Sequence, residues 1–277
     1  MRLRRRKQRY DAGSLGFDAV DTYPGSTGVP NIDWLIGDPV VTPPEADPLC
    51  SERVMRLPHT VFCFAPEAEY PLPDFGVGQG RPLTFGSFNN IPKLTPHTIR
   101  LWADVLHAVA GSRLLLRAPS FKDAGAVTRF RRLFADHGIG ADRLLLRGPV
   151  GLDAMMQAYS EIDIALDPVP YCGGTTSLQA LWMGVPILTL EGGQFVSRMG
   201  ASFMTAAGLP DWVARDEADY VAKAADVAQD HAALLDLKRG LRARLLAQPG
   251  WDADRYAKDF GEALRQTWGK TMQIKDK

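Results

Sequence analysis

From about residue 79 to residue 190, the hydrophobic positions of the chain follow two alternating patterns. Short runs rich in apolar residues, some with polar ends, occur at residues 83–88, 113–117, 143–147, 162–167 and 187–190, and they read as strands. Between these runs, apolar residues recur at helical spacing at residues 95–110, 123–137, 152–159 and 175–183. Strands that alternate with helices predict an α/β fold built on a parallel, doubly wound sheet with right-handed crossovers.

The residues at the ends of the expected helices support these boundaries. Thr95 is a good N-cap, and Pro96 suits the first turn of the helix that follows. Gly138 is placed to end the second helix, and Gly184 is placed to end the fourth, since glycine readily adopts the left-handed conformation of a C-cap.

The two ends of the chain have a different character. Residues 23–73 are rich in proline and glycine and show no complete βαβ repeat, so we interpret them as a connector. Residues 1–9 are strongly basic and lack the apolar segment of a secretory signal, so we interpret them as a solvated tail. After residue 216 the pattern is mostly helical, and beyond residue 267 it is polar, where we expect fraying. The sequence thus predicts two parts, residues 1–78 and residues 79–277.

The composition of the chain argues against several classes of protein, among them nucleic-acid-binding, membrane-spanning and disulfide-rich proteins. The formal net charge is zero, which gives no support for nucleic-acid binding, and no apolar run is long enough to span a membrane. Cys50, Cys63 and Cys172 are unevenly spaced and form no CxxC pair, which argues against a zinc site and against a disulfide framework. Because this cysteine usage fits a reducing compartment, we expect a cytoplasmic location.

The richest candidate site is the stretch DPVPYCGGTTSLQALWMGVP, residues 167–186. Gly173 and Gly174 let the backbone turn after an apolar run, and Thr175 or Thr176 is a good N-cap for the next helix. Free N–H groups at such a helix start favour an anion, most often a phosphate. A plain βαβ turn with a glycine-rich cap is the alternative. In doubly wound sheets ligands bind beyond the carboxyl ends of the strands, so the loops after residues 88, 147 and 167 form the expected site.

Several segments, in the same order, carry a family resemblance from about residue 19 to residue 268. They are FGSFNNIPKL at 85–94, GPVGLDAMMQAY at 148–159, LDPVPYCGGTTSLQALWMGVP at 166–186, SRMGAS at 197–202, and YPGSTG, IDW and SERVMRLPHTVFCF earlier in the chain. Together they resemble the C-terminal catalytic part of the Spindly-like O-linked N-acetylglucosamine transferases. The resemblance implies the Rossmann-like C-terminal half of a GT-B glycosyltransferase, with residues 1–78 holding a remnant of the N-terminal half.

The resemblance also implies an activity and a set of site residues. Family members transfer N-acetylglucosamine, or in some cases fucose, from a nucleotide sugar to Ser or Thr of proteins, without a metal or another cofactor. Lys93 matches the lysine that neutralises the diphosphate leaving group, which is electrostatic stabilisation of a developing charge. The remaining matched positions are expected to bind the nucleotide sugar: Asn90, Val150, Met155, Gly174, Thr175, Thr176 and Gln179.

The chain departs from the family pattern in ways that bear on activity. Met155 stands where the family usually has a histidine against the nucleobase, and Gln179 stands where an acidic residue usually holds the ribose. Most of the N-terminal half and the tetratricopeptide repeats have no counterpart. None of the histidines matches the family's proposed catalytic histidine: His59, His97, His107, His137 and His231.

Two interpretations stay open at this point. The chain is the C-terminal part of a protein O-GlcNAc transferase and is incomplete by itself, or it is a decayed, non-catalytic module that binds nucleotide or other proteins. In either case the missing half would leave apolar surface exposed around Trp34, Ile36 and Phe62. Such a surface predicts self-association, or a partner that supplies the missing half, beside a nucleotide sugar and an acceptor protein.

Overall fold

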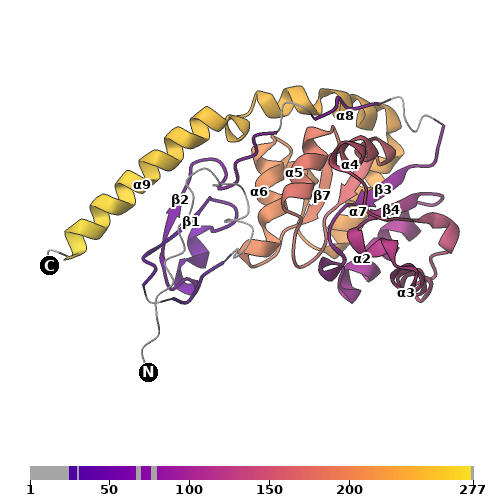
Figure 1. Cartoon of the computed structure of the whole chain (residues 1–277), viewed down its shortest axis with the longest axis horizontal. Coiled ribbons are helices and arrows are strands. Elements are labelled where there is room, and N and C mark those ends of the chain that lie inside the picture. The colour runs from indigo at the N-terminus through magenta and orange to yellow at the C-terminus, as the bar shows by residue number, and fades with distance from the viewer. Residues whose placement is uncertain (1–24, 30, 67–69, 76–79, 276–277) are drawn as a thin grey trace.

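The computed structural model describes residues 25–29, 31–66, 70–75 and 80–275, with side chains as far as residue 272, and contains one main parallel sheet (Figure 1). Its strands are β3 (Thr84–Ser87), β4 (Arg113–Arg117), β5 (Leu144–Arg147), β6 (Ile164–Leu166), β7 (Ile187–Leu190) and β8 (Val213–Ala214). They lie in the order β5-β4-β3-β6-β7-β8, and every pair is parallel. The predicted doubly wound sheet is confirmed, and the two-residue β8 adds an edge that the apolar pattern did not reveal.

Helices follow the strands and flank the sheet (Figure 1). They are α2 (Pro96–Ala108), α3 (Ala124–Ala135), α4 (Leu152–Ala158), α5 (Thr175–Trp182), α6 (Met199–Ala206), α7 (Glu217–Gln229), α8 (His231–Leu246) and α9 (Ala253–Lys275). The expected caps form at α2, where Thr95 accepts a hydrogen bond from the Thr98 N–H, and at Gly138 and Gly184, whose φ angles are +77° and +76°. Among the described residues, no helix is both long enough and apolar enough to cross a bilayer.

The core lies between the sheet and these helices. Leu114, Leu115 and Leu116 are successive residues of β4, and all three are at most 1% exposed. A strand whose successive side chains are all buried is covered on both faces. Trp102 of α2 and Phe134 of α3 are fully buried and pack in the same cluster.

The first described part of the chain contains a small folded unit that the sequence pattern did not predict. Strands β1 (Trp34–Gly37) and β2 (Arg53–Arg56) form a parallel pair joined by the 3-10 helix η1 (Pro44–Leu49). The crossover escaped notice because a short 3-10 helix with a proline inside it has no helical apolar periodicity. This β1–η1–β2 unit lies beside the main sheet, beneath α9 (Figure 1).

The buried carboxyl of Asp38 joins this unit to the rest of the molecule. Its Oδ1 accepts the N–H groups of Val40 and Val41, both at 2.8 Å. Its Oδ2 accepts the Val61 N–H at 2.9 Å and the hydroxyl of Ser202, on α6, at 2.8 Å. A carboxyl that is 0% exposed is tolerated because these four donors replace water.

The expected exposed surface is only partly where the sequence placed it. Phe62 is buried, since its ring packs against Phe203 at 4.7 Å and against Phe195 at 6.2 Å. Trp34 and Ile36 are half-buried, and Trp34 Nε1 donates to Thr271 of α9 at 2.9 Å. That contact also explains why the chain stays helical to Lys275, where fraying was expected.

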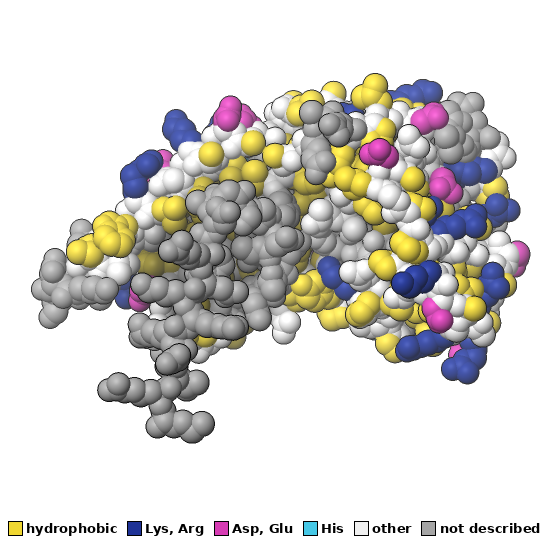
Figure 2. Space-filling view, in the orientation of Figure 1, with side chains coloured by type: hydrophobic (Ala, Val, Ile, Leu, Met, Phe, Trp, Pro, Cys, Tyr) yellow, Lys and Arg dark blue, Asp and Glu magenta, His cyan; other side chains and the backbone are white. Residues whose placement is uncertain are grey.

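Exposed apolar side chains lie in the first part of the chain, where Leu49 and Leu72 are 77% and 80% exposed, and along α9. Leu264, Trp268 and Met272 are 47%, 70% and 44% exposed, and their spacing of four residues puts them on one side of the helix. Figure 2 shows apolar side chains at the outer end of this helix, away from the sheet.

The Asp38 contacts generate a stability prediction. Asp38→Ala leaves three buried N–H groups and a hydroxyl without their acceptor, so we expect a loss of about 3 kcal/mol in the free energy of unfolding. Denaturant unfolding followed by circular dichroism measures this change. Asp104→Ala is the control, because its exposed ion pair with Arg100 contributes less than about 1 kcal/mol. Equal losses for the two variants would contradict the role given to Asp38.

Candidate functional site

The strand order defines a switch point between β3 and β6. From β3 the chain proceeds through β4 to β5 on one side, and from β6 it proceeds through β7 to β8 on the other. Ligands of open α/β sheets bind at the carboxyl edge where the order reverses. The structure brings together two of the three loops expected at the site, those after β3 and β6. The third, after β5, lies two strands away.

Asp167 shapes the turn that follows β6. Its carboxyl is buried, and it accepts the Gly173 N–H at 2.6 Å and the Thr189 hydroxyl at 2.8 Å. Burial raises the pKa of this carboxyl, although these two hydrogen bonds act in the opposite direction. Through these contacts one side chain fixes the glycine turn against strand β7.

Two glycines allow the close approach that this turn needs. A Cβ at Gly200, in α6, would overlap the Asp167 carboxylate and the Thr189 side chain. A Cβ at Gly173 would overlap the hydroxyl of Ser177 and crowd Asn89. The glycines therefore serve packing at this edge, since neither has a positive φ angle.

Lys93 reaches this turn from the loop after β3. Lys93 ends the short 3-10 helix η2 (Ile91–Lys93), and its Nζ donates to the Cys172 carbonyl at 2.8 Å. The same ammonium lies 4.2 Å from the centre of the Tyr171 ring, a distance typical of cation–π contacts. The predicted cationic residue therefore stands directly on the predicted anion-binding turn.

Helix α5 begins beside this lysine. Its N-cap is Gly174, which corrects the prediction of a threonine cap, and Thr175 and Thr176 are the first helical residues. No side chain caps the start of this helix. Both threonines are half-buried at this opening.

Asn89, which the sequence reasoning passed over, connects the two loops. Thr176 Oγ1 donates to Asn89 Oδ1 at 3.3 Å, and Asn89 Nδ2 donates to the Ser87 hydroxyl at 3.1 Å. The expected ligand-binding residue Asn90 is exposed and forms the N-cap of η2. Both residues lie beyond the end of β3, so no local periodicity in the sequence distinguishes them.

Val150 and Met155 lie on the side of the site formed by β5 and α4. Val150 is 46% exposed in the loop after β5, and Met155 of α4 is half-buried. Tyr159, just after α4, is buried and donates to the Thr176 carbonyl at 2.8 Å, which links this side to α5. Burial raises the pKa of Tyr159, so its hydroxyl stays a donor.

Gln179 is less accessible than the sequence suggested. It lies on α5 one turn after Thr175, but it is only 5% exposed. Its Nε2 lies 3.4 Å from the hydroxyl of Tyr70, a residue of the segment between the two parts of the chain.

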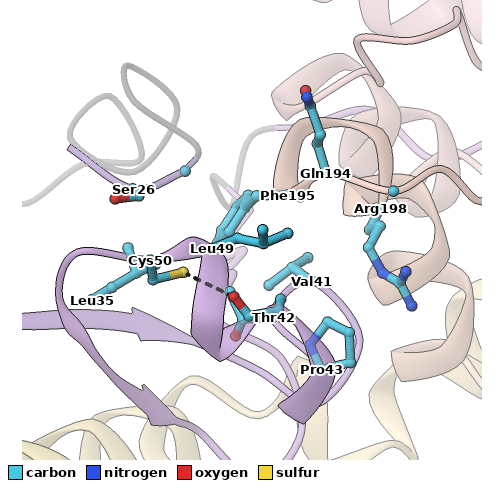
Figure 3. Close-up of a pocket in the computed structure, with 13 residues that line it drawn as sticks. Ser26, Leu35, Val41, Thr42, Pro43, Leu49, Cys50, Gln194, Phe195 and Arg198 are labelled. Carbon is cyan, nitrogen blue, oxygen red and sulfur yellow. Dashed lines mark hydrogen bonds between the residues drawn. The ribbon is translucent and has the colours of Figure 1, made fainter. Parts of the chain in front are cut away.

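A cavity of about 430 Å³ lies between the β1–η1–β2 unit and the loop after β7 (Figure 3). Leu35, Val41 and Leu49 of the β1–η1–β2 unit form one wall, and Phe195 from the loop after β7 points toward them. The Val196 carbonyl, next to Phe195 in the chain, accepts the Cys172 N–H at 3.0 Å, so the loop after β7 contacts the turn after β6.

Glu52 holds the rim of this cavity. Ser26 lines the cavity, and its hydroxyl donates to Glu52 Oε2 at 2.8 Å, while the Thr27 N–H donates to Oε1 at 2.7 Å. The side-chain hydrogen bond from Thr27, above all, lowers the pKa of Glu52 to about 2. The remaining rim of the glycine-rich segment continues into residues outside the described part of the chain.

A parallel sheet flanked by helices, with its strand order reversing at a switch point, is the architecture of one half of a GT-B glycosyltransferase. A comparison with protein families matches residues 65–260 to the model of glycosyltransferase family 41. The chain belongs to this family.

The relatives support this assignment. The probable UDP-N-acetylglucosamine–peptide N-acetylglucosaminyltransferase SPINDLY of Oryza sativa subsp. japonica is 36% identical over 89% of this chain and 27% of the rice protein. The corresponding protein of Caenorhabditis elegans is 27% identical over 77% of this chain and 18% of its own length. The chain thus spans about a quarter of the length of the rice relative.

Solved structures agree with the fold. An O-GlcNAc transferase mutant of Thermobaculum terrenum matches with a TM-score of 0.84 and 33% identity, over 91% of this chain and 48% of that chain. HepE of Anabaena, in complex with UDP and glucose, matches with a TM-score of 0.56 and 14% identity, over 84% of this chain and 63% of that chain. At this identity the second match shows the fold alone.

The packing around Asp167 predicts the effect of a single methyl group. In Gly200→Ala the new Cβ meets two hydrogen-bonded, buried side chains, so we expect a loss of about 2–3 kcal/mol in the free energy of unfolding. Gly240→Ala on α8 is the matched control, because nothing lies near its Cβ and alanine favours a helix by up to about 1 kcal/mol. Thermal unfolding distinguishes them, and an unchanged midpoint for Gly200→Ala would contradict the close packing.

The lowered pKa of Glu52 predicts a pH-dependent contribution to stability. A carboxyl with a folded pKa of about 2 and an ordinary value of 4.5 stabilises the fold above pH 4.5 and loses this effect as the pH falls toward 2. Glu52→Gln should therefore cost about 1–2 kcal/mol at pH 7 and progressively less below pH 4.5. Urea unfolding of both proteins between pH 7 and pH 3.5 tests this, and a difference that grows in acid would be the opposite result.

Proposed function

We propose that the chain binds a UDP-sugar between Lys93 and the start of α5, and that it forms the donor side of a protein O-GlcNAc transferase. The observation that carries this proposal is the meeting of a lysine with an uncapped helix start at the switch point of the sheet. Transfer of N-acetylglucosamine from the UDP-sugar to Ser or Thr of a protein is the reaction that the names of the relatives favour.

Lys93 has the electrostatic role in this reaction. When the bond between the sugar and the diphosphate breaks, negative charge grows on the leaving oxygen, and a nearby ammonium stabilises that charge. The Cys172 carbonyl and the Tyr171 ring hold Nζ at the turn, where its positive charge would stabilise phosphate oxygens. No step requires a metal, since the cation is supplied by the protein.

The other matched residues would hold the donor in place. The N–H groups after Gly174, together with the Thr175 and Thr176 hydroxyls, would bind the diphosphate at the positive end of the α5 dipole. Val150 and Met155 would contact the nucleobase with apolar surface. Gln179 is buried, and Asn90 forms the N-cap of η2, so any contribution of these two residues to donor binding would pass through neighbouring side chains.

The acceptor side needs further protein. An acceptor hydroxyl must be held beside the sugar for transfer, and the cavity next to Phe195 is lined by the loop after β7, which contacts the donor turn. The exposed side of α9 with Leu264, Trp268 and Met272 is a surface on which a second α/β half or another copy would pack. A cytoplasmic location fits three cysteines that form no disulfide.

The donor proposal predicts that UDP binding depends on Lys93. Lys93→Ala removes a charge-assisted hydrogen bond to phosphate, so we expect UDP to bind at least about tenfold more weakly by calorimetry. Lys258→Ala, an exposed lysine of α9, is the control and should leave the affinity unchanged. Equal heats of binding for wild type and Lys93→Ala would remove Lys93 from the site.

A further inference from the structure

Tyr70 covers the residue that was expected to hold the ribose. Gln179 is 5% exposed, and its Nε2 donates to the Tyr70 hydroxyl at 3.4 Å. Tyr70 itself is half-buried, so it keeps part of its surface open. At this point of α5 the polar group available to a ligand is therefore the phenol of Tyr70, with Gln179 beneath it.

Contacts along α5 fix the segment that carries Tyr70. The Phe64 ring meets the Trp182 ring at 6.4 Å, at the far end of the helix. Arg242 donates to the Trp182 carbonyl at 2.9 Å and to the Pro71 carbonyl at 3.5 Å, which ties the residue after Tyr70 to the same helix. Residues on either side of Tyr70 in the sequence are thus held at the far end of α5, and Tyr70 itself contacts the helix at Gln179.

The Tyr70 hydroxyl contacts the middle of α5, at Gln179. Gln179 is three residues after Thr176, a rise of about 4.5 Å along the axis. Tyr70 is also near Tyr159: burial is the main cause that raises the pKa of Tyr159, and the Tyr70 phenol raises it further. Tyr159 in turn donates a hydrogen bond to the Thr176 carbonyl in the first turn of α5. A ribose joined to a phosphate at the start of α5 reaches about this far.

The Tyr70 hydroxyl accepts one hydrogen bond, from Gln179, and can donate another. A phenol oxygen accepts hydrogen bonds and donates one. Because Tyr70 Oη accepts the Gln179 N–H, its own hydrogen points elsewhere, and no acceptor within the described parts of the chain takes it. A sugar hydroxyl oxygen beside this phenol would complete its hydrogen bonding.

We propose that Tyr70 donates this hydrogen to a ribose hydroxyl of the bound nucleoside diphosphate, and that Gln179 is the positioning residue that orients it. The inference rests on the proposed function, because the ribose is placed by a diphosphate at the start of α5. The neutral pair of Tyr70 and Gln179 would then replace the acidic side chain that usually holds the ribose at position 179 in the family.

The test compares UDP with 2′,3′-dideoxy-UDP, which lacks both ribose hydroxyls, by calorimetry on the full chain. Wild type should prefer UDP by about 5- to 10-fold, the factor expected for one neutral hydrogen bond. Tyr70→Phe should lose this preference by weakening UDP alone, and Gln179→Leu should reduce it. Tyr256→Phe, which loses a hydrogen bond to the Val61 carbonyl outside the site, is the matched control and should keep the preference.

Other results would contradict either the ribose contact of Tyr70 or the binding of the donor itself. If Tyr70→Phe keeps the wild-type preference, or binds UDP more tightly, then the phenol is packing or an obstruction, and the ribose contact is wrong while donor binding stands. If wild type shows no heat with UDP, the proposed function itself fails, and the ribose contact fails with it. The wild-type titration therefore separates the two failures.

Discussion

The buried carboxyl of Asp167 is the constraint on which the site geometry depends. It stands directly after β6, where its N–H still belongs to the sheet through the Leu188 carbonyl, and its side chain turns back to hold Gly173. The next residues of the turn carry the Cys172 carbonyl that positions Lys93. The start of α5 follows at once, so one carboxyl sets the place of both the cationic side chain and the helix N–H groups.

This arrangement carries an electrostatic cost next to an anion site. A buried carboxylate would repel a bound diphosphate, yet burial raises the pKa of Asp167 and so favours the neutral form, whereas Lys93 and the hydrogen bonds favour the charged form. The carboxyl is buried and faces the Gly173 N–H and the Thr189 hydroxyl, with Gly200 of α6 packed against it. Stability and ligand binding are therefore linked through the same side chain.

The sequence predicts the strands of the main sheet better than it predicts the β1–η1–β2 unit and the contacts between distant parts of the chain. The runs at residues 113–117 and 187–190 match β4 and β7 end to end, because continuous apolar strands between caps leave little freedom. The β1–η1–β2 unit was missed, since a 3-10 crossover has no helical period. The helix beyond residue 267 was missed for another reason: Thr271 meets Trp34 across 237 positions, and no local pattern reports such a contact. The same limit applies to Tyr70 and Gln179, which are 109 positions apart.

The departures from the family pattern affect the proposed contacts with the base and the ribose, and they leave the proposed contacts with the diphosphate unaltered. Met155 and Gln179 concern the base and the ribose, which stay unchanged while the sugar is transferred, so weaker contacts there reduce the binding of donor and of transition state alike. Lys93 and the start of α5 concern the diphosphate, where charge develops, and the structure keeps them together on the Asp167 turn. A site altered in this way would bind its donor less tightly and still stabilise the leaving group. The physical requirement for transfer that remains is then the placement of the acceptor beside the donor.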